Sequence, residues 1–69
     1  MNKNCATRRF CLLVKEVRES LGMTQEELAD KSNHHRTYIS MVERGIKIPT
    51  LSTAEDIAKA LGKDLKELI

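Results

Sequence analysis

The stretch "TQEELADKSNHHRTYISMVERG", Thr24 to Gly45, carries two helical patterns separated by a short polar link. The first pattern begins at Thr24, whose hydroxyl can cap a helix. Glu27 stands three residues later, at the position that completes a capping box. This start predicts a helix over residues 25–32.

The second pattern is "RTYISMVER", in which Ile39 and Val42 fall on one face and Gly45 can end the helix. It predicts a helix over residues 36–44, which follows the link "SNHH". Two helices joined by a turn of about three or four residues form the helix-turn-helix motif, whose second helix can lie in the DNA major groove. The stretch therefore favours a protein that binds DNA.

Apolar residues with helical spacing also flank this stretch. Upstream, they predict a helix over residues 7–21 that ends at Gly22. Downstream, Pro49 indicates a loop, and Thr50 or Ser52 can cap the helix that follows. The upstream stripe consists of Phe10, Leu13, Val14, Val17 and Leu21, and the downstream stripe of Leu51, Ala54, Ile57, Ala58 and Leu61.

A last short helix, "LKELI", is predicted after Asp64, which can cap it together with Glu67. The chain has 69 residues, enough for one small domain. Apolar residues make up 41% of it and aromatic residues only 3%, which suits packed helices better than a β-sandwich. We expect an all-α, five-helix fold, with a flexible tail over residues 1–6 and a helix-turn-helix DNA-binding domain over residues 7–69.

Several other classes of protein fit the sequence poorly. The longest apolar run, "FCLLV" from Phe10 to Val14, is far shorter than the roughly 20 residues of a membrane span. No secretory signal follows the basic N-terminal residues, so we expect a cytoplasmic protein without membrane contact. Cys5 and Cys11 match neither a disulfide framework nor a zinc motif, and reduced thiols are expected.

The neighbouring His34 and His35 raise the question of a metal site. Adjacent residues of a helix point about 100° apart, and the nearest thiols lie on another predicted helix, so we expect neither a metal nor a cofactor. A turn residue and a helix cap near phosphates are the expected roles, and their protonation in acid should strengthen DNA binding. The sequence shows no nucleophile elbow, phosphate-binding loop or His-Glu-x-x-His spacing, so no catalytic residues and no enzyme are predicted.

The net charge of +2 says little about partners, but its distribution is informative. Residues 1–15 and 31–49 are net basic, whereas the intervening residues 16–30 are net acidic. If the fold brings the two basic segments together, the protein presents one positive face to a nucleic acid. Otherwise these charges are ordinary solvated surface.

Three segments carry a resemblance to a known family: "VRESLGMTQEELA" (Val17–Ala29), "RTYISMVERG" (Arg36–Gly45) and "PTLSTAEDIAKALG" (Pro49–Gly62). In order and spacing they resemble the Xre family of helix-turn-helix domains, which includes the lambdoid-phage repressor and Cro proteins. The match covers about residues 12–69 and implies a lambda-repressor-like fold. Within the family, "KSNHHRTYISMVERG" resembles the controller proteins of restriction–modification systems. In those proteins a fifth helix helps to form the dimer, and it is longer than the segment Asp64–Ile69.

The first turn of the helix predicted over residues 36–44 holds the candidate base-reading residues. Arg36 can donate two hydrogen bonds to a guanine, and the methyl group of Thr37 can touch a thymine methyl. The resemblance to controller proteins adds Tyr38 as a DNA contact. The alternatives are ordinary exposed surface for Arg36 and Thr37, and packing against residues 25–32 for Tyr38.

A second set of residues is expected to hold the phosphate backbone, which fixes register without reading sequence. Gln25 is similar to the family glutamine at this position, although it is also a good first residue of a helix. Lys47 is either a phosphate contact or a solvated charge. The full set is Gln25, Ser40, Arg44 and Lys47.

Two further sets of residues have expected structural roles. Arg18 and Glu43 resemble a family ion pair that joins the first helix to the end of the recognition helix. A domain this small has little room to bury every apolar residue at its C-terminal end. Leu65, Leu68 and Ile69 are therefore expected to form a dimer surface.

These residues predict a sequence-specific transcriptional regulator, either an activator or a repressor, that binds double-stranded DNA as a homodimer. Its operator should be two-fold related, and the resemblance implies control of restriction–modification genes. A contact with RNA polymerase is left open. The alternative is a protein-interaction module, antitoxin-like or anti-repressor, which the apolar C-terminal end favours and the outward basic residues oppose.

Overall fold

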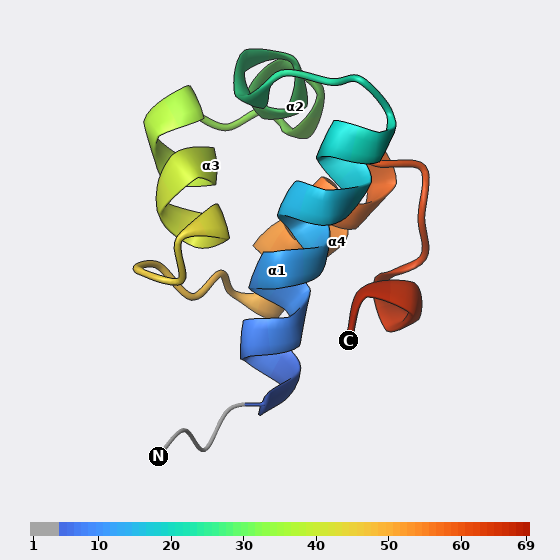
Figure 1. Cartoon of the computed structure of the whole chain (residues 1–69). Helices are drawn as coiled ribbons and strands as arrows, with labels where there is room; N and C mark the ends of the chain where they lie inside the picture. Colours follow the sequence, from blue (N-terminus) through green and yellow to red (C-terminus); the bar gives the residue numbers. More distant parts are fainter. Residues whose placement is uncertain (1–4) are drawn as a thin grey trace.

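The computed structural model describes residues 5–69, which form four α-helices, one 3-10 helix and no strand (Figure 1). The all-α prediction is confirmed. The elements are α1 (Cys5–Ser20), α2 (Gln25–Ser32), α3 (Arg36–Glu43), α4 (Leu51–Ala60) and η1 (Leu65–Leu68). α2 has the predicted bounds, and α3 ends one residue before the predicted end.

Two further predictions, about the two ends of the chain, were wrong. The fifth element is the 3-10 helix η1, so residues 5–69 contain four α-helices rather than five. Its four residues suit hydrogen bonds that span three residues, whereas α-helical bonds span four. Residues 5 and 6, predicted to belong to the flexible tail, are already helical; residues 1–4 of that tail lie outside the described residues.

Local hydrogen bonds explain where α2 and α4 begin. The Thr24 hydroxyl accepts the Glu27 N–H at 3.0 Å, and the Glu27 carboxylate accepts the Thr24 N–H at 2.9 Å. This is the predicted capping box. The Thr50 hydroxyl accepts the Thr53 N–H at 3.2 Å, so Thr50 rather than Ser52 caps α4.

The turn between α2 and α3 depends on Asn33, which adopts the left-handed conformation with φ 63° and ψ 44°. Asparagine tolerates this conformation better than most residues with a side chain. The next N–H, from His34, donates to the carbonyl of Ala29 at 2.9 Å and closes the end of α2. The chain therefore reverses tightly and sends α3 away from α2 at a fixed angle.

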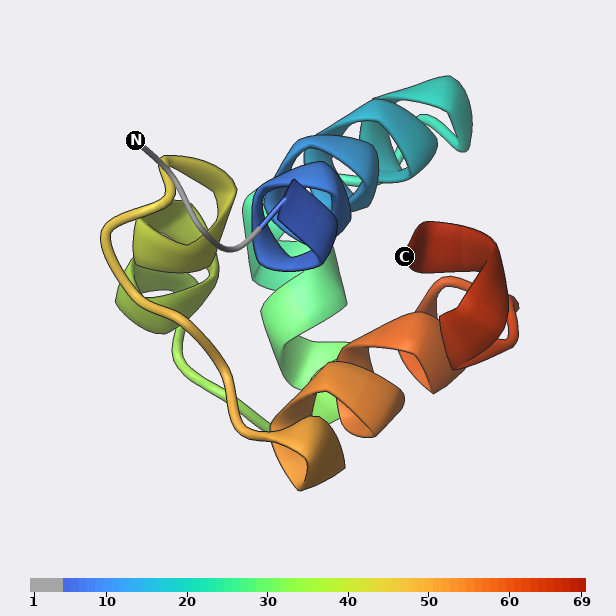
Figure 2. The same cartoon turned by 90° about the horizontal axis from the view of Figure 1, so that it is seen from below.

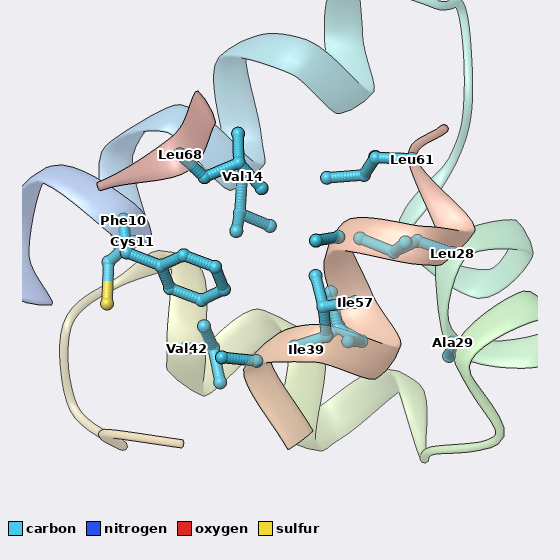
Figure 3. Close-up of a cluster of buried hydrophobic side chains, with 12 residues drawn as sticks. Phe10, Cys11, Val14, Leu28, Ala29, Ile39, Val42, Ile57, Leu61 and Leu68 are labelled. Carbon is cyan, nitrogen blue, oxygen red and sulfur yellow. The ribbon is translucent and has the colours of Figure 1, made fainter. Parts of the chain in front are cut away.

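The core lies where α1, α2, α3, α4 and η1 meet. α2 packs against α3 and α4, while α1 packs against α3 and η1. In the view from below, the C-terminal turn lies beside α1 (Figure 2). Figure 3 shows the buried side chains, which are Phe10, Cys11, Val14, Leu28, Ala29, Ile39, Val42, Ala54, Ile57, Ala58, Leu61 and Leu68.

Three apolar residues lie elsewhere than the sequence predicted. Leu68, expected on the dimer surface, is only 1% exposed because η1 folds back and inserts it against α1 and α4 (Figure 3). Leu21 is exposed because it lies beyond the end of α1, where helical periodicity no longer applies. Leu51, the first residue of α4, is 70% exposed.

Cys11 is a buried free thiol, and burial raises its pKa because the charged thiolate loses hydration. Less thiolate is then present at any given pH. In a Cys5→Ser variant, which leaves Cys11 as the single thiol, a disulfide reagent at about pH 8 should react at least about tenfold more slowly with folded than with denatured protein. Equal rates in the two states would contradict this prediction.

No helix within residues 5–69 is long and apolar enough to cross a membrane.

Candidate nucleic-acid interface

The two basic segments are neighbours in the folded chain, because α1 packs against α3 (Figure 1). Around α3 the basic side chains of Arg36, Arg44 and Lys47 are all exposed. This region carries positive charge on the outside of the helix-turn-helix motif.

α3 buries one face and exposes its first turn. Ile39 and Val42 are buried in the core, whereas Arg36 and Thr37 are exposed. His35 precedes them as the N-cap residue, with extended backbone and no side-chain cap hydrogen bond. The start of α3 is thus an accessible, positively charged helix end of the kind that reaches base edges in DNA complexes.

The end of α3 is tied to α1 by an ion pair between Arg18 and Glu43. The Arg18 Nε donates to Glu43 Oε2 at 2.7 Å, and its Nη2 donates to Glu43 Oε1 at 3.1 Å. The side chain of Glu43 is 3% exposed and that of Arg18 is 10% exposed. Such a two-pronged contact fixes both distance and orientation.

Arg18 has a third hydrogen bond, from Nη1 to the carbonyl of Met23 at 2.8 Å, in the link between α1 and α2. The hydrogen bond to Glu43 raises the pKa of Arg18, and partial burial opposes that rise only in part. The guanidinium is consequently charged at every pH at which the protein would be studied. Three segments of the chain therefore converge on one permanently charged group.

Gln25 extends this network to the protein surface. Its Nε2 donates to Glu43 Oε1 at 3.0 Å, and its Oε1 accepts a long bond of 3.4 Å from Arg36 Nη1. The first residue of α2 thus connects the buried ion pair to the exposed guanidinium at the start of α3. The sequence did not reveal this connection, because residues 18 positions apart carry no local signal of contact.

Tyr38 is half-buried and packs against the core. Its ring also stacks on the imidazole of His34, with centroids 5.3 Å apart and an angle of 29° between the planes. The ring therefore has packing partners within the domain, the core and His34. Because the ring is only half-buried, part of the side chain still faces solvent beside the first turn of α3.

The remaining predicted contact residues lie along and after α3. Ser40 and Met41 are half-buried, Arg44 is the exposed C-cap, and Lys47 is exposed in the loop that follows. The Lys47 N–H donates to the carbonyl of Met41 at 3.2 Å, which holds the loop close to the helix end. These positions follow α3 from its middle to its C-terminal end.

An apolar groove of about 220 Å³ lies at a different place, between the start of α1, the start of α4 and η1. Leu51 and Ile69 stand at this groove with 70% and 54% of their surface exposed, and Leu65 is half-buried in it. Two of the three residues predicted for a dimer surface therefore lie together. The complete lining is Thr7, Phe10, Pro49, Leu51, Ala54, Leu65 and Ile69.

Comparisons with known proteins agree with this geometry. The family model described as helix-turn-helix matches residues 14–68. The control protein C.BamHI of Bacillus amyloliquefaciens is 46% identical over 57 residues, which span 81% of this chain and 70% of that protein.

Two solved structures are also similar. The restriction–modification controller protein C.AhdI from Aeromonas hydrophila matches with a TM-score of 0.86 at 33% identity, covering 93% of this chain and 96% of that one. The controller protein C.Esp1396I, solved as a tetramer in complex with its natural 35-base-pair operator, matches with a TM-score of 0.84 at 38% identity. That match covers 91% of this chain and 87% of the other.

Proposed function

Since the chain belongs to the Xre-type helix-turn-helix family, we propose that it is a sequence-specific DNA-binding transcriptional regulator of the restriction–modification controller type. It binds double-stranded DNA as a homodimer on a two-fold related operator. The observation that carries the proposal is the exposed first turn of α3, where the Arg36 guanidinium is held by Gln25.

In this proposal Arg36 and Thr37 read base edges, with Tyr38 beside them. An arginine can donate two parallel hydrogen bonds to guanine O6 and N7, a pattern that no other base presents in the major groove. The contact with Gln25 restricts the arginine before DNA arrives, so less side-chain entropy is lost on binding. The Thr37 side chain is exposed next to it and offers its methyl group to a thymine.

Gln25, Ser40, Arg44 and Lys47 hold the phosphate backbone in this arrangement. The side-chain amide of Gln25 already donates one hydrogen to Glu43 and accepts from Arg36. Its remaining amide hydrogen and the free N–H groups at the start of α2 are then the donors available to a phosphate. Arg44 and Lys47 add charge that fixes register without reading sequence.

The dimer forms through the apolar groove, with Leu65 and Ile69 as predicted and Leu51 in place of the buried Leu68. A second copy related by a two-fold axis would cover these exposed side chains on both protomers. The two recognition helices would then meet half-sites about one helical turn, ~34 Å, apart or a multiple of it.

Selection of bound duplexes from a random-sequence DNA pool at about 150 mM salt tests both sequence-specific DNA binding and dimerisation. The wild-type protein should enrich a two-fold symmetric consensus. Leu51→Asp should bind that consensus roughly tenfold more weakly, because the two half-sites are no longer engaged together. Leu51 is exposed and begins α4, where an acidic residue favours the helix dipole, so the fold should persist.

Leu21→Asp is the matched control, because Leu21 is also an exposed leucine but lies outside the groove. It should bind like the wild type. Failure to enrich any duplex would overturn the proposed function and favour the protein-interaction module.

A further inference from the structure

We propose that His34 and Asp56 position Tyr38 for DNA recognition and make operator binding respond to pH. This inference rests on the proposed function and adds two residues, His34 and Asp56, to the predicted site. His34 lies in the turn between α2 and α3, Tyr38 lies in the first turn of α3, and Asp56 lies on α4. The three side chains link the recognition helix to the helix that follows it.

One imidazole makes two contacts, one through its face and one through a nitrogen at its edge. The ring stacks on Tyr38 at a centroid separation of 5.3 Å, and its Nε2 lies 3.7 Å from Asp56 Oδ2. That separation is within reach of an ion pair but too long for a hydrogen bond. A shift of about 0.8–1 Å would convert it into a charge-assisted bond.

The Nε2 atom of His34 is fully buried and has no hydrogen-bond partner among the described residues. Buried polar atoms are nearly always paired, and those that are not call for an explanation. The Asp56 carboxylate, 3.7 Å away, would attract a protonated ring directly. The unpaired nitrogen therefore fits a contact that closes when the histidine gains a proton.

Other charged groups surround the turn. Glu26 and Asp30 of α2 and Arg36 of α3 line the same hollow as His34 and His35. Lys31 and Lys59 stand beside Asp56 on the neighbouring surface. Among all these groups, Asp56 is the one at ion-pair distance from the His34 ring.

Protonation would act on Tyr38 through the stack. The imidazolium is drawn toward Asp56, and its positive charge lies against the face of the tyrosine ring, which attracts cations. Both effects hold the ring in one place beside the first turn of α3. Operator affinity should therefore rise when the imidazole gains a proton.

Added positive charge near phosphates would also strengthen binding in acid, but the two mechanisms differ in their response to Asp56→Asn. If charge alone acts, removing a carboxylate strengthens DNA binding. If His34 acts through Asp56, the same change weakens operator binding in acid. Glu55→Gln is the matched control, because Glu55 is the adjacent exposed acid on α4 and has no ion pair with His34.

The first measurement needs no DNA. The chain has one tyrosine and no tryptophan, so its intrinsic emission reports Tyr38 alone. Emission should titrate with pH in the wild type and in His35→Gln, and should be flat across the same range in His34→Gln. Circular dichroism at about pH 8 verifies that each variant remains helical. If the emission of His34→Gln changed with pH as that of the wild type does, the inference would be overturned.

The second measurement is the affinity for the selected duplex at about pH 8 and about pH 6. Wild type and Glu55→Gln should gain about two- to fivefold on acidification, whereas His34→Gln and Asp56→Asn should gain less. A full gain in Asp56→Asn would overturn the inference while leaving the proposed function intact. Absence of any bound duplex would instead overturn the proposed function, which the emission titration does not depend on.

Discussion

Glu43→Ala is expected to lower the free energy of unfolding by about 3–5 kcal/mol. The substitution removes both carboxylate oxygens that accept from Arg18. The permanently charged, nearly buried guanidinium keeps only the Met23 carbonyl and a 3.9 Å ion pair with the exposed Glu19. It also removes the acceptor of the Gln25 amide. A domain of this size has a total stability of about 5 kcal/mol, so about 0–2 kcal/mol should remain and roughly 3–50% of the variant should be unfolded at room temperature.

Denaturant titration followed by circular dichroism measures the effect. The double variant Arg18→Met with Glu43→Leu is the control, because replacing both charges by apolar side chains should recover much of the lost stability. DNA binding of Glu43→Ala should fall in proportion to its unfolded fraction. If Glu43→Ala had the thermal stability of the wild type, the ion pair would not be what holds α1 to α3.

Arg36→Ala should cost about 1–3 kcal/mol on the selected duplex and relax the preference at one base pair. Arg36 is exposed, and its only described side-chain contact is the long bond to Gln25, so the fold should be unaffected. Binding to a random duplex of equal length should change far less. Fluorescence anisotropy at one fixed salt concentration gives both affinities.

Lys47→Ala is the matched control for loss of one positive charge. It should weaken binding to both duplexes alike and reduce the slope of affinity against salt by about one. Lys47 is exposed in the loop after α3, so this change should also leave the fold intact. Equal losses on selected and random DNA for Arg36→Ala would refute the base-reading role.

Much of the helical layout could be predicted because its signals are local. The capping box at Thr24, the bounds of α2 and the buried face of α3 all depend on residues three or four positions apart. The resemblance to a known family supplied the pairing of Arg18 with Glu43, which are 25 positions apart. No spacing rule would have joined them.

Predictions failed where packing between distant segments decides the outcome. The apolar pattern at the C-terminal end did not distinguish Leu68, which enters the core, from Ile69, which remains exposed. Leu51 continued a regular apolar stripe, yet it lies beyond the region that the other helices cover. A pattern identifies a face of a helix, but it does not tell how far along that face a partner extends.

The sequence by itself determined the all-α class, the position of the helix-turn-helix and the exposed basic start of its second helix, because caps, turns and periodicity act over a few residues. Only the tertiary structure decided that Gln25 links the buried Glu43 to Arg36, and that His34 lies between Tyr38 and Asp56. These contacts join side chains from separate segments of the chain. They form only when the helices pack together, and that packing is set by the shared core, to which every helix contributes.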